Sequence, residues 1–180
     1  MTTTITTATS TRSKLVPMRR VACILGALLL VAAPASAALI TRHATTATYK
    51  LTLSVGPVEK MYTADEVQMK HVTDGEVMVG HAMTMEGMSM GGANRHLEVH
   101  VASRATGKIV TNVRPTIMLT DTSAMGGMAM SEKVNAMAMQ GIGEGIADRH
   151  YGDNVKLTAG HAYKVVVTVK GEKATFTFKA

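Results

Sequence analysis

Two short segments of the chain place side chains that could bind a metal ion at regular spacing. Polar and apolar residues alternate in His96-Leu-Glu98-Val-His100, and His150 supplies a further imidazole later in the chain. Alternate side chains of a β-strand share one face and lie about 6.5 Å apart, so two of them can reach one ion. Imidazole and carboxylate suit copper and zinc. The same alternation is equally typical of a solvated strand face, so both interpretations remain.

Methionine is concentrated where little else could pack against it. Thirteen of the 15 methionines follow residue 37, and many lie among Gly, Ser and Thr. A thioether is a soft, neutral ligand that favours Cu(I), although methionine also serves as an adaptable filler of gaps. Because methionine forms three such clusters, we favour binding of copper or silver over a role in filling gaps between side chains. Their members are His81, Met83, Met85, Met88 and Met90 in the first, Met125, Met128 and Met130 in the second, and Met137 and Met139 in the third.

The elements that would position these residues have the two-residue period of strands. Apolar residues alternate over 49–55 and 97–101, and a β-rich run over 163–169 is followed by a turn at 170–172 and a return strand at 174–178. Short strands separated by turn signals predict an all-β fold, specifically a β-sandwich.

Other segments lack this period. Residues 61–71 predict a short helix, with Thr63 as N-cap and Glu66 three residues later. Two stretches rich in Gly, Met and Ala, 83–93 and 123–145, are predicted to be loops.

The two histidine segments resemble a known family. His96-Leu-Glu98-Val-His100 and His150-Tyr-Gly-Asp-Asn154 look like motifs of the periplasmic proteins that accompany bacterial high-affinity iron permeases. The resemblance covers roughly residues 94–180. It implies an immunoglobulin-like β-sandwich, often a homodimer, with a copper site and a role beside an inner-membrane permease that imports iron.

The resemblance also implies a ligand set. The family's His-x-Glu strand would correspond to His96 and Glu98, its turn histidine to His150, and its loop methionine to Met139 or Met137. The late histidine-rich insertion of the family is missing, because the turn at 170–172 closes the last hairpin tightly. A further ligand would then come from His81 or His100. The copper site is therefore expected to persist, whereas the iron-uptake role is in doubt.

The first 37 residues have the three parts of a secretory signal. Arg19 and Arg20 precede an apolar run over 21–33, and Ala35-Ser36-Ala37 offers a cleavage site. Met18 is an alternative start of translation. The alternative to a cleaved signal is a retained membrane anchor, but the apolar run is shorter than the roughly 20 residues that span a bilayer. We expect a mature protein of residues 38–180 in the periplasm or outside the cell.

Composition narrows the classes of function. The signal holds four basic residues and no acidic one, so the formal charge falls from +6 to +2 without it, and no basic stripe suggests nucleic-acid binding. We expect one domain that binds metal without catalysis: copper as Cu(I) or Cu(II), with iron as an alternative, and a permease or an efflux pump as partner. The alternatives are a zinc hydrolase that uses His96, His100 and His150 with Glu98 as base, or a plain interaction module.

Overall fold

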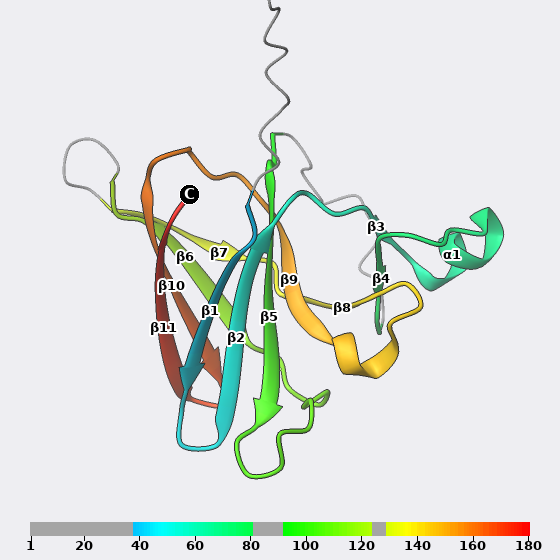
Figure 1. Cartoon of the computed structure of the whole chain (residues 1–180), viewed down its shortest axis with the longest axis horizontal. Helices are drawn as coiled ribbons and strands as arrows, with labels where there is room; N and C mark the ends of the chain where they lie inside the picture. Colours follow the sequence, from blue (N-terminus) through cyan, green and yellow to red (C-terminus); the bar gives the residue numbers. More distant parts are fainter. Residues whose placement is uncertain (1–37, 81–91, 124–128) are drawn as a thin grey trace, which may run out of the picture. The chain divides into compact units, whose positions relative to one another are not determined.

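Strands dominate the part of the chain that the computed structural model describes, which is residues 38–80, 92–123 and 129–180 (Figure 1). These residues belong to one compact unit, Ser36–Ala180. They form two sheets, with one short α-helix, α1, and one 3-10 helix, η2 (Gly145–Asp148). The predicted all-β class is therefore confirmed. Neither helix of the described residues is long and apolar enough to cross a membrane.

The larger sheet has seven strands, and its neighbours are antiparallel except for the parallel pair of β3 and β4. In spatial order they are β1 (Ile40–Thr45), β2 (Tyr49–Gly56), β5 (Arg95–Ser103), β9 (His150–Val155), β8 (Met137–Gly141), β4 (Glu76–Met78) and β3 (Met61–Tyr62). The smaller sheet is antiparallel and contains β11 (Glu172–Lys179), β10 (Ala162–Val169), β6 (Thr116–Asp121) and β7 (Met130–Val134).

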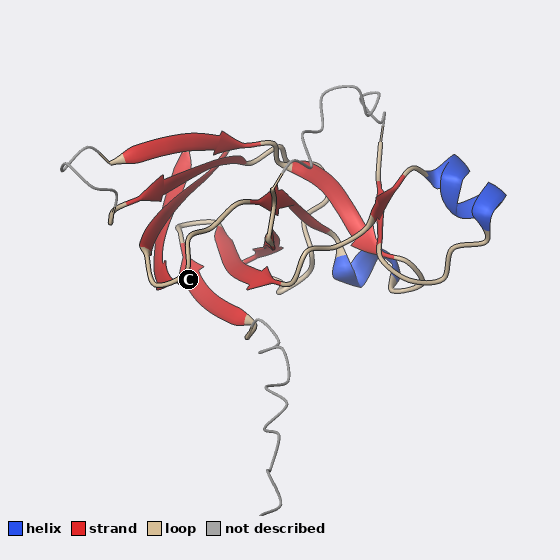
Figure 2. Cartoon of the chain, turned by 90° about the horizontal axis from the view of Figure 1, so that it is seen from above, coloured by secondary structure: helices blue, strands red, loops and turns tan. Residues whose placement is uncertain are grey.

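The main core lies between the two sheets, which form the two layers of strands seen from above in Figure 2. Alternation along each strand sends one set of side chains inward. From the larger sheet these include Leu53, Leu97 and Val99, and from the smaller sheet Ile117 and Val165, all of them fully buried. The outward face of the larger sheet is thereby left for polar groups.

The far end of the larger sheet has a small core of its own. Met61, Met78 and Met139 are buried together, and Met137 packs against them. They come from β3, β4 and β8, the three strands beyond β9. Methionine side chains therefore supply the apolar contacts in the part of the sheet that the main core does not fill.

The predicted terminal hairpin is confirmed. Strands β10 and β11 pair in register from Ala162 opposite Lys179 to Val169 opposite Glu172. Lys170 and Gly171 both have positive φ, 46° and 87°. Two consecutive residues with positive φ are those of the type I′ turn, whose twist matches that of the strands it joins.

The predicted short helix is also confirmed, as α1 (Ala64–Lys70). The side chain of Thr63 accepts a hydrogen bond from the backbone N–H of Glu66, and the Glu66 carboxylate accepts one from the N–H of Thr63. This capping box satisfies two amides that the first turn leaves without partners. The helix begins later than residue 61 because Met61 and Tyr62 pair with β4 instead.

The predicted loop over 123–145 is wrong for two segments within it. Residues 130–134 form β7, which pairs with β6, and residues 137–141 form β8, which pairs with β9 and β4. Residues 130–134 include Glu and Lys, and residues 137–141 include Ala and Gly, all of which are depleted in strands, so pairing with the neighbouring strands supplies the order. Of the other predicted loop, 83–93, all but the last two residues lie outside the described residues.

Candidate metal centre

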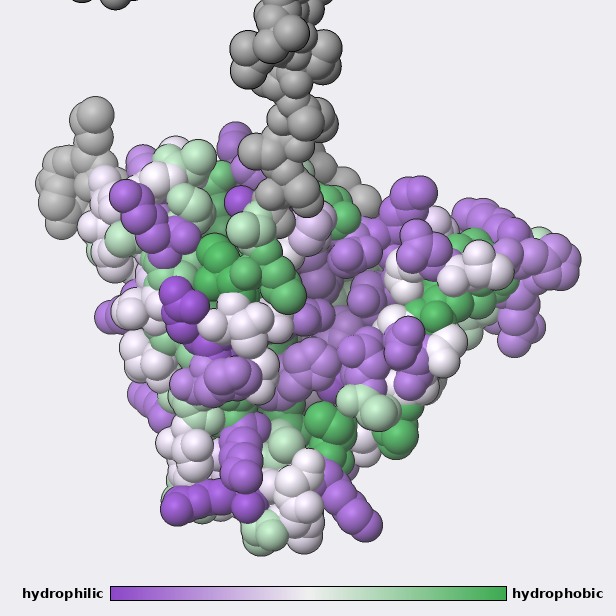
Figure 3. Space-filling model, in the orientation of Figure 1, coloured by the Kyte–Doolittle hydropathy of each residue, from purple (hydrophilic) through white to green (hydrophobic). Residues whose placement is uncertain are grey.

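The outward face of the larger sheet carries the candidate ligands. On β5, His96, Glu98 and His100 alternate with the inward Leu97 and Val99. Hydrophilic residues gather over β5 and the strands beside it in Figure 3, which views this face. The face therefore presents imidazole and carboxylate groups beside one another.

His96, Glu98 and His150 converge, as predicted. Each offers a ligand atom within 4.8 Å of those of the other two. His150 Nε2 lies 3.8 Å from Glu98 Oε2, and the two imidazole rings have centroids 5.9 Å apart. Two ligands bonded at about 2 Å to one ion lie about 2.8 to 4 Å apart, according to the angle between them. That the three residues bind metal remains a prediction.

Hydrogen bonds on the far side of both rings determine which nitrogen carries the proton. Asn154 Oδ1 accepts from the Glu59 N–H, and Asn154 Nδ2 donates to the Glu59 carbonyl, which orients the amide. His96 Nδ1, 3.1 Å from that Oδ1, must therefore donate its proton to it. His150 Nδ1 likewise donates to the Asp148 carbonyl at 2.8 Å. In both neutral rings the Nε2 lone pair is left to point into the site.

Within the part of the chain that the structure describes, neither lone pair meets a hydrogen-bond donor: His96 Nε2 and His150 Nε2 are buried without a partner there, and the residues are 3% and 0% exposed. Burial lowers the pKa of both histidines, which keeps the rings neutral near pH 7. Buried polar atoms are rarely left unpaired. Two unpaired imidazole nitrogens beside a carboxylate are the arrangement that a metal ion would satisfy.

Glu98 provides that carboxylate in its ionised form. Burial alone would raise its pKa, but hydrogen bonds from His100 and Ser54 and the charges of His150 and His100 outweigh burial and bring the pKa to about 2. Cross-strand pairing with Ser54 on β2 places that hydroxyl beside it. The site therefore holds a negative charge across the physiological pH range.

A second carboxylate, Glu76, was not predicted. Its Oε2 lies 3.4 Å from His150 Nε2 and is buried, with no hydrogen-bond partner in residues 38–80, 92–123 and 129–180. Burial, together with the charges of Asp148, Glu98 and Glu59, raises the pKa of Glu76 to about 7. Glu76 precedes both histidines in the sequence. The pairing of β4 with β8, and of β8 with β9, brings it beside His150.

The register of β8 distinguishes between the two methionines that the sequence left open. Met139 pairs directly with His150, whereas Met137 pairs with Gly152 one step along the ladder. Directly opposite residues of an antiparallel pair have Cβ atoms about 4.5 to 5.5 Å apart on the same face. Met139 is fully buried beside His150 and is therefore the better placed thioether.

Gly152 allows the close approach of β9 to β5 behind the ligands. A Cβ at this position would overlap the Leu97 carbonyl oxygen and would lie 2.9 Å from the Glu98 Cα. Any side chain here would push apart the strands that carry Glu98 and His150.

The remaining predicted ligands divide into two groups. His100 joins the cluster: its ring centroid is 5.3 Å from that of His150, and its Nε2 is 3.6 Å from Glu98 Oε1. Asp148, which was not predicted, completes a second group with His100 and His150 whose ligand atoms also lie within 4.8 Å of one another. The rest of the predicted ligands lie outside the described residues: His81, Met83, Met85, Met88 and Met90.

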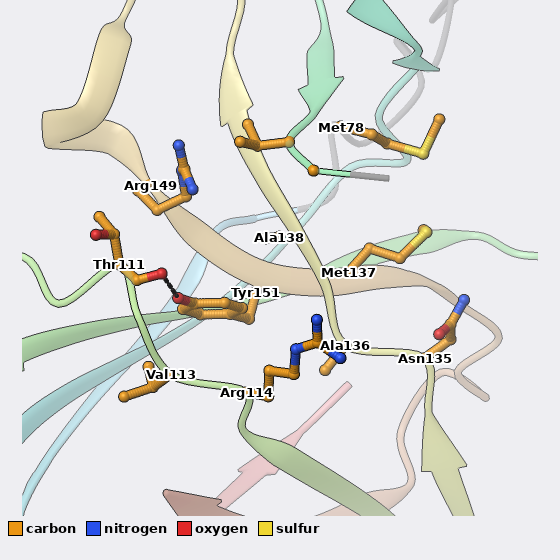
Figure 4. Close-up of a pocket in the computed structure, with 12 residues that line it drawn as sticks. Met78, Thr111, Val113, Arg114, Asn135, Ala136, Met137, Ala138, Arg149 and Tyr151 are labelled. Carbon is orange, nitrogen blue, oxygen red and sulfur yellow. Dashed lines mark hydrogen bonds between the residues drawn. The ribbon is translucent and has the colours of Figure 1, made fainter. Parts of the chain in front are cut away.

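Strands β8 and β9 also border a cavity of about 470 Å³ (Figure 4). Arg149 and Ala138, neighbours of His150 and Met139, line it together with Arg114 and Tyr151. The Tyr151 hydroxyl donates to the Thr111 carbonyl at 3.2 Å. Of the two candidate methionines, Met137 lines this cavity and Met139 does not.

Comparison of the chain with protein-family models, with curated proteins and with solved structures found no match. The chemical interpretation of the site consequently depends on its own donor set, which fits a metal ion: two neutral imidazole nitrogens and a carboxylate whose ligand atoms lie within 4.8 Å of one another, with Met139 opposite His150 on the neighbouring strand.

Proposed function

We propose that this protein is an exported copper-binding protein that carries or stores the ion without catalysing a reaction. Its ligands are His96, Glu98, His150 and Met139, and Glu76 lies within reach of the same ion. The proposal includes an immunoglobulin-like β-sandwich, a cleaved signal over residues 1–37 and a periplasmic or extracellular location. A metal permease or an efflux pump in the inner membrane is the proposed partner.

The observation that carries the proposal is the pair of buried Nε2 atoms of His96 and His150, which have no hydrogen-bond partner among the described residues. Asn154 and the Asp148 carbonyl hold the two rings so that both lone pairs converge. Outer partners of this kind orient histidine ligands in metalloproteins.

The donor set favours copper over the other first-row ions. Nitrogen, oxygen and sulfur ligands together suit an ion that changes between a soft and a borderline state. The thioether of Met139 would stabilise Cu(I), and the carboxylate of Glu98 would stabilise Cu(II). A zinc enzyme makes no use of a thioether, and the wholly buried His150 supports storage over hydrolysis of a large substrate.

Copper titration of the purified metal-free protein tests this proposal. We expect one Cu(II) ion with nitrogen hyperfine structure in its EPR spectrum, and His96→Ala and His150→Ala should each weaken binding at least about tenfold. His43→Ala is the matched control, because His43 is exposed on β1, where its Nδ1 forms a hydrogen bond with the Thr52 hydroxyl. Equal copper affinity in all three variants would refute the assignment.

The export part of the proposal has its own test. Mass spectrometry of the protein recovered from the cell exterior or periplasm should show a chain that begins at Ala38. A chain that retains residues 1–37 in the membrane fraction would contradict a cleaved signal.

A further inference from the structure

The cavity beside strands β8 and β9 is a candidate site for a small molecule (Figure 4). Its volume of about 470 Å³ falls within the range of about 300 to 1,000 Å³ that is typical of pockets for such ligands. The residues assigned to the copper ion are absent from its described lining. The cavity is therefore separate from the proposed copper centre and needs an interpretation of its own.

The inner wall of the cavity is apolar and belongs to the edge of the main core. Val113 and Tyr151 are members of that core and are 4% and 2% exposed. Ala136 and Ala138 also line the cavity and pack against the core. The Tyr151 hydroxyl already donates to the Thr111 carbonyl, so the ring contributes mainly apolar surface. The small alanine side chains leave the space beside this wall open.

Two arginines supply the formal charge of the cavity lining that the structure describes. Arg114 and Arg149 both line it, and in Figure 4 the Tyr151 ring lies between them, whereas no acidic residue belongs to the described lining. Within residues 38–80, 92–123 and 129–180, neither guanidinium forms an ion pair. Arg149 Nη2 donates to Gln140 Oε1 at 3.3 Å, and Arg149 Nε is buried without a hydrogen-bond partner in the same ranges. Two cations without a countercharge favour an anionic ligand.

The two properties of the lining together define the class of ligand. The parallel N–H donors of a guanidinium match the two oxygens of a carboxylate. An inorganic anion would fill only a small part of the cavity and would leave the apolar wall in contact with water. A ligand that fits both the charge and the wall has a carboxylate at one end and an apolar body at the other.

We propose that this cavity binds a small organic carboxylate with an aromatic or branched apolar body. Arg114 and Arg149 bind the carboxylate, and Tyr151, Val113 and the two alanines contact the apolar body. Arg114 is exposed and Arg149 is half-buried, so the charged end of the ligand lies toward solvent. Binding requires no metal ion and is a function additional to the proposed copper binding.

The test uses metal-free protein, so that a carboxylate cannot bind to a metal ion instead. The probe is 2-naphthoate, whose fluorescence can be followed because the chain has no tryptophan. The comparison probes, measured by calorimetry, are 2-naphthamide, a neutral analogue of nearly the same shape, and inorganic phosphate. We expect one 2-naphthoate per chain, with affinity at least about tenfold higher than that of either comparison probe.

Substitutions separate the charge of the cavity from its apolar wall. Arg114→Gln and Arg149→Gln should each weaken 2-naphthoate binding at least about tenfold and change 2-naphthamide binding by less than about twofold. Arg104→Gln is the matched control, because it removes the same charge from an exposed arginine outside the cavity lining. Ala138→Leu should weaken both naphthalene probes, because the larger side chain fills the cavity. Circular dichroism checks the fold of each variant, and the exposed Arg114 can be replaced without disturbing the core.

Several outcomes would overturn the proposal. Equal affinities for 2-naphthoate and 2-naphthamide would mean an apolar cavity that does not recognise the carboxylate. Unchanged 2-naphthoate affinity in both Arg114→Gln and Arg149→Gln would remove the assigned residues, and tighter binding of phosphate would mean a site for inorganic anions. Absence of saturable 2-naphthoate binding to the wild-type chain would overturn the proposal outright, and none of these outcomes bears on the copper function.

Discussion

The Glu76→Gln substitution should stabilise the metal-free protein at alkaline pH. Glutamine has nearly the same shape as glutamate but cannot ionise, so it removes the cost of a buried charge near Glu98 and Asp148. The pKa of Glu76 is about 7 in the folded protein against an ordinary value of 4.5. The folded state therefore binds this proton more tightly than the unfolded state does.

The direction of the pH effect follows from that difference. Between about pH 4.5 and about 7, the unfolded chain loses the proton first, so the stability that Glu76 contributes falls as the pH rises. The difference between the two pKa values corresponds to about 3 kcal/mol above pH 7. Because the side chain is only 11% exposed, little of this is screened by solvent. We expect a gain of about 2 to 3 kcal/mol for Glu76→Gln near pH 8.5, and less than about 1 kcal/mol near pH 5.

Urea unfolding in the presence of a chelator measures this effect. Glu132→Gln is the control, because Glu132 is exposed on β7 and its neutralisation should change stability by less than about 0.5 kcal/mol. Glu98, whose pKa is lowered to about 2, loses its contribution below pH 4.5 and so does not interfere in this window. Equal stability of wild type and Glu76→Gln near pH 8.5, or a less stable variant, would refute the reasoning.

Three further substitutions separate the metal site from the fold. Met139→Leu should cost less than about 1.5 kcal/mol in urea unfolding, because volume and apolarity are kept, yet it should lower Cu(I) affinity more than Cu(II) affinity in competition with chelators; equal losses for both ions would contradict a thioether ligand. Gly152→Ala should lower the free energy of unfolding by about 1 to 3 kcal/mol through overlap with β5 and weaken copper binding at the same time, and normal stability with normal copper binding would show that the strands can move apart. Thr63→Ala should cost about 1 kcal/mol through loss of the capping box and should leave copper binding unchanged, so any loss of copper affinity would place α1 within the site.

The strands that could be predicted from the sequence are those whose own residues have both the period and the preference for strands. Val, Leu, Tyr and Phe alternate in β2, β5, β10 and β11, and each was found near its expected place. Strands β7 and β8 carry weak strand formers, and their order comes from pairing with β6 and β9. These two segments are strands because they pair with their neighbours, and the residues of the segments alone do not indicate that pairing.

The same distinction applies to the site. His96 and Glu98 share a strand face, so their proximity follows from alternation alone. Glu76 belongs to a three-residue strand, and its place beside His150 depends on the register of β4 against β8. Asp148 belongs to a 3-10 turn, whose geometry has no two-residue period. Only register, likewise, could decide between Met139 and Met137.

The small methionine core of β3, β4 and β8 has a consequence for how fast the ion enters and leaves. The buried hydrophobic side chains of these strands are Met61, Met78 and Met139, a much smaller cluster than the main core, so we expect these strands to open locally at a lower free energy than the rest of the fold. Strands β4 and β8 carry Glu76 and Met139, whereas β5 and β9 carry the other ligands. A bound ion would therefore link β4 and β8 to the strands that pack on the main core. Amide hydrogen exchange in these strands should be fast without metal and slow with it. The rate of that opening would then set the rate at which an ion bound to the fully buried His150 is released to a partner.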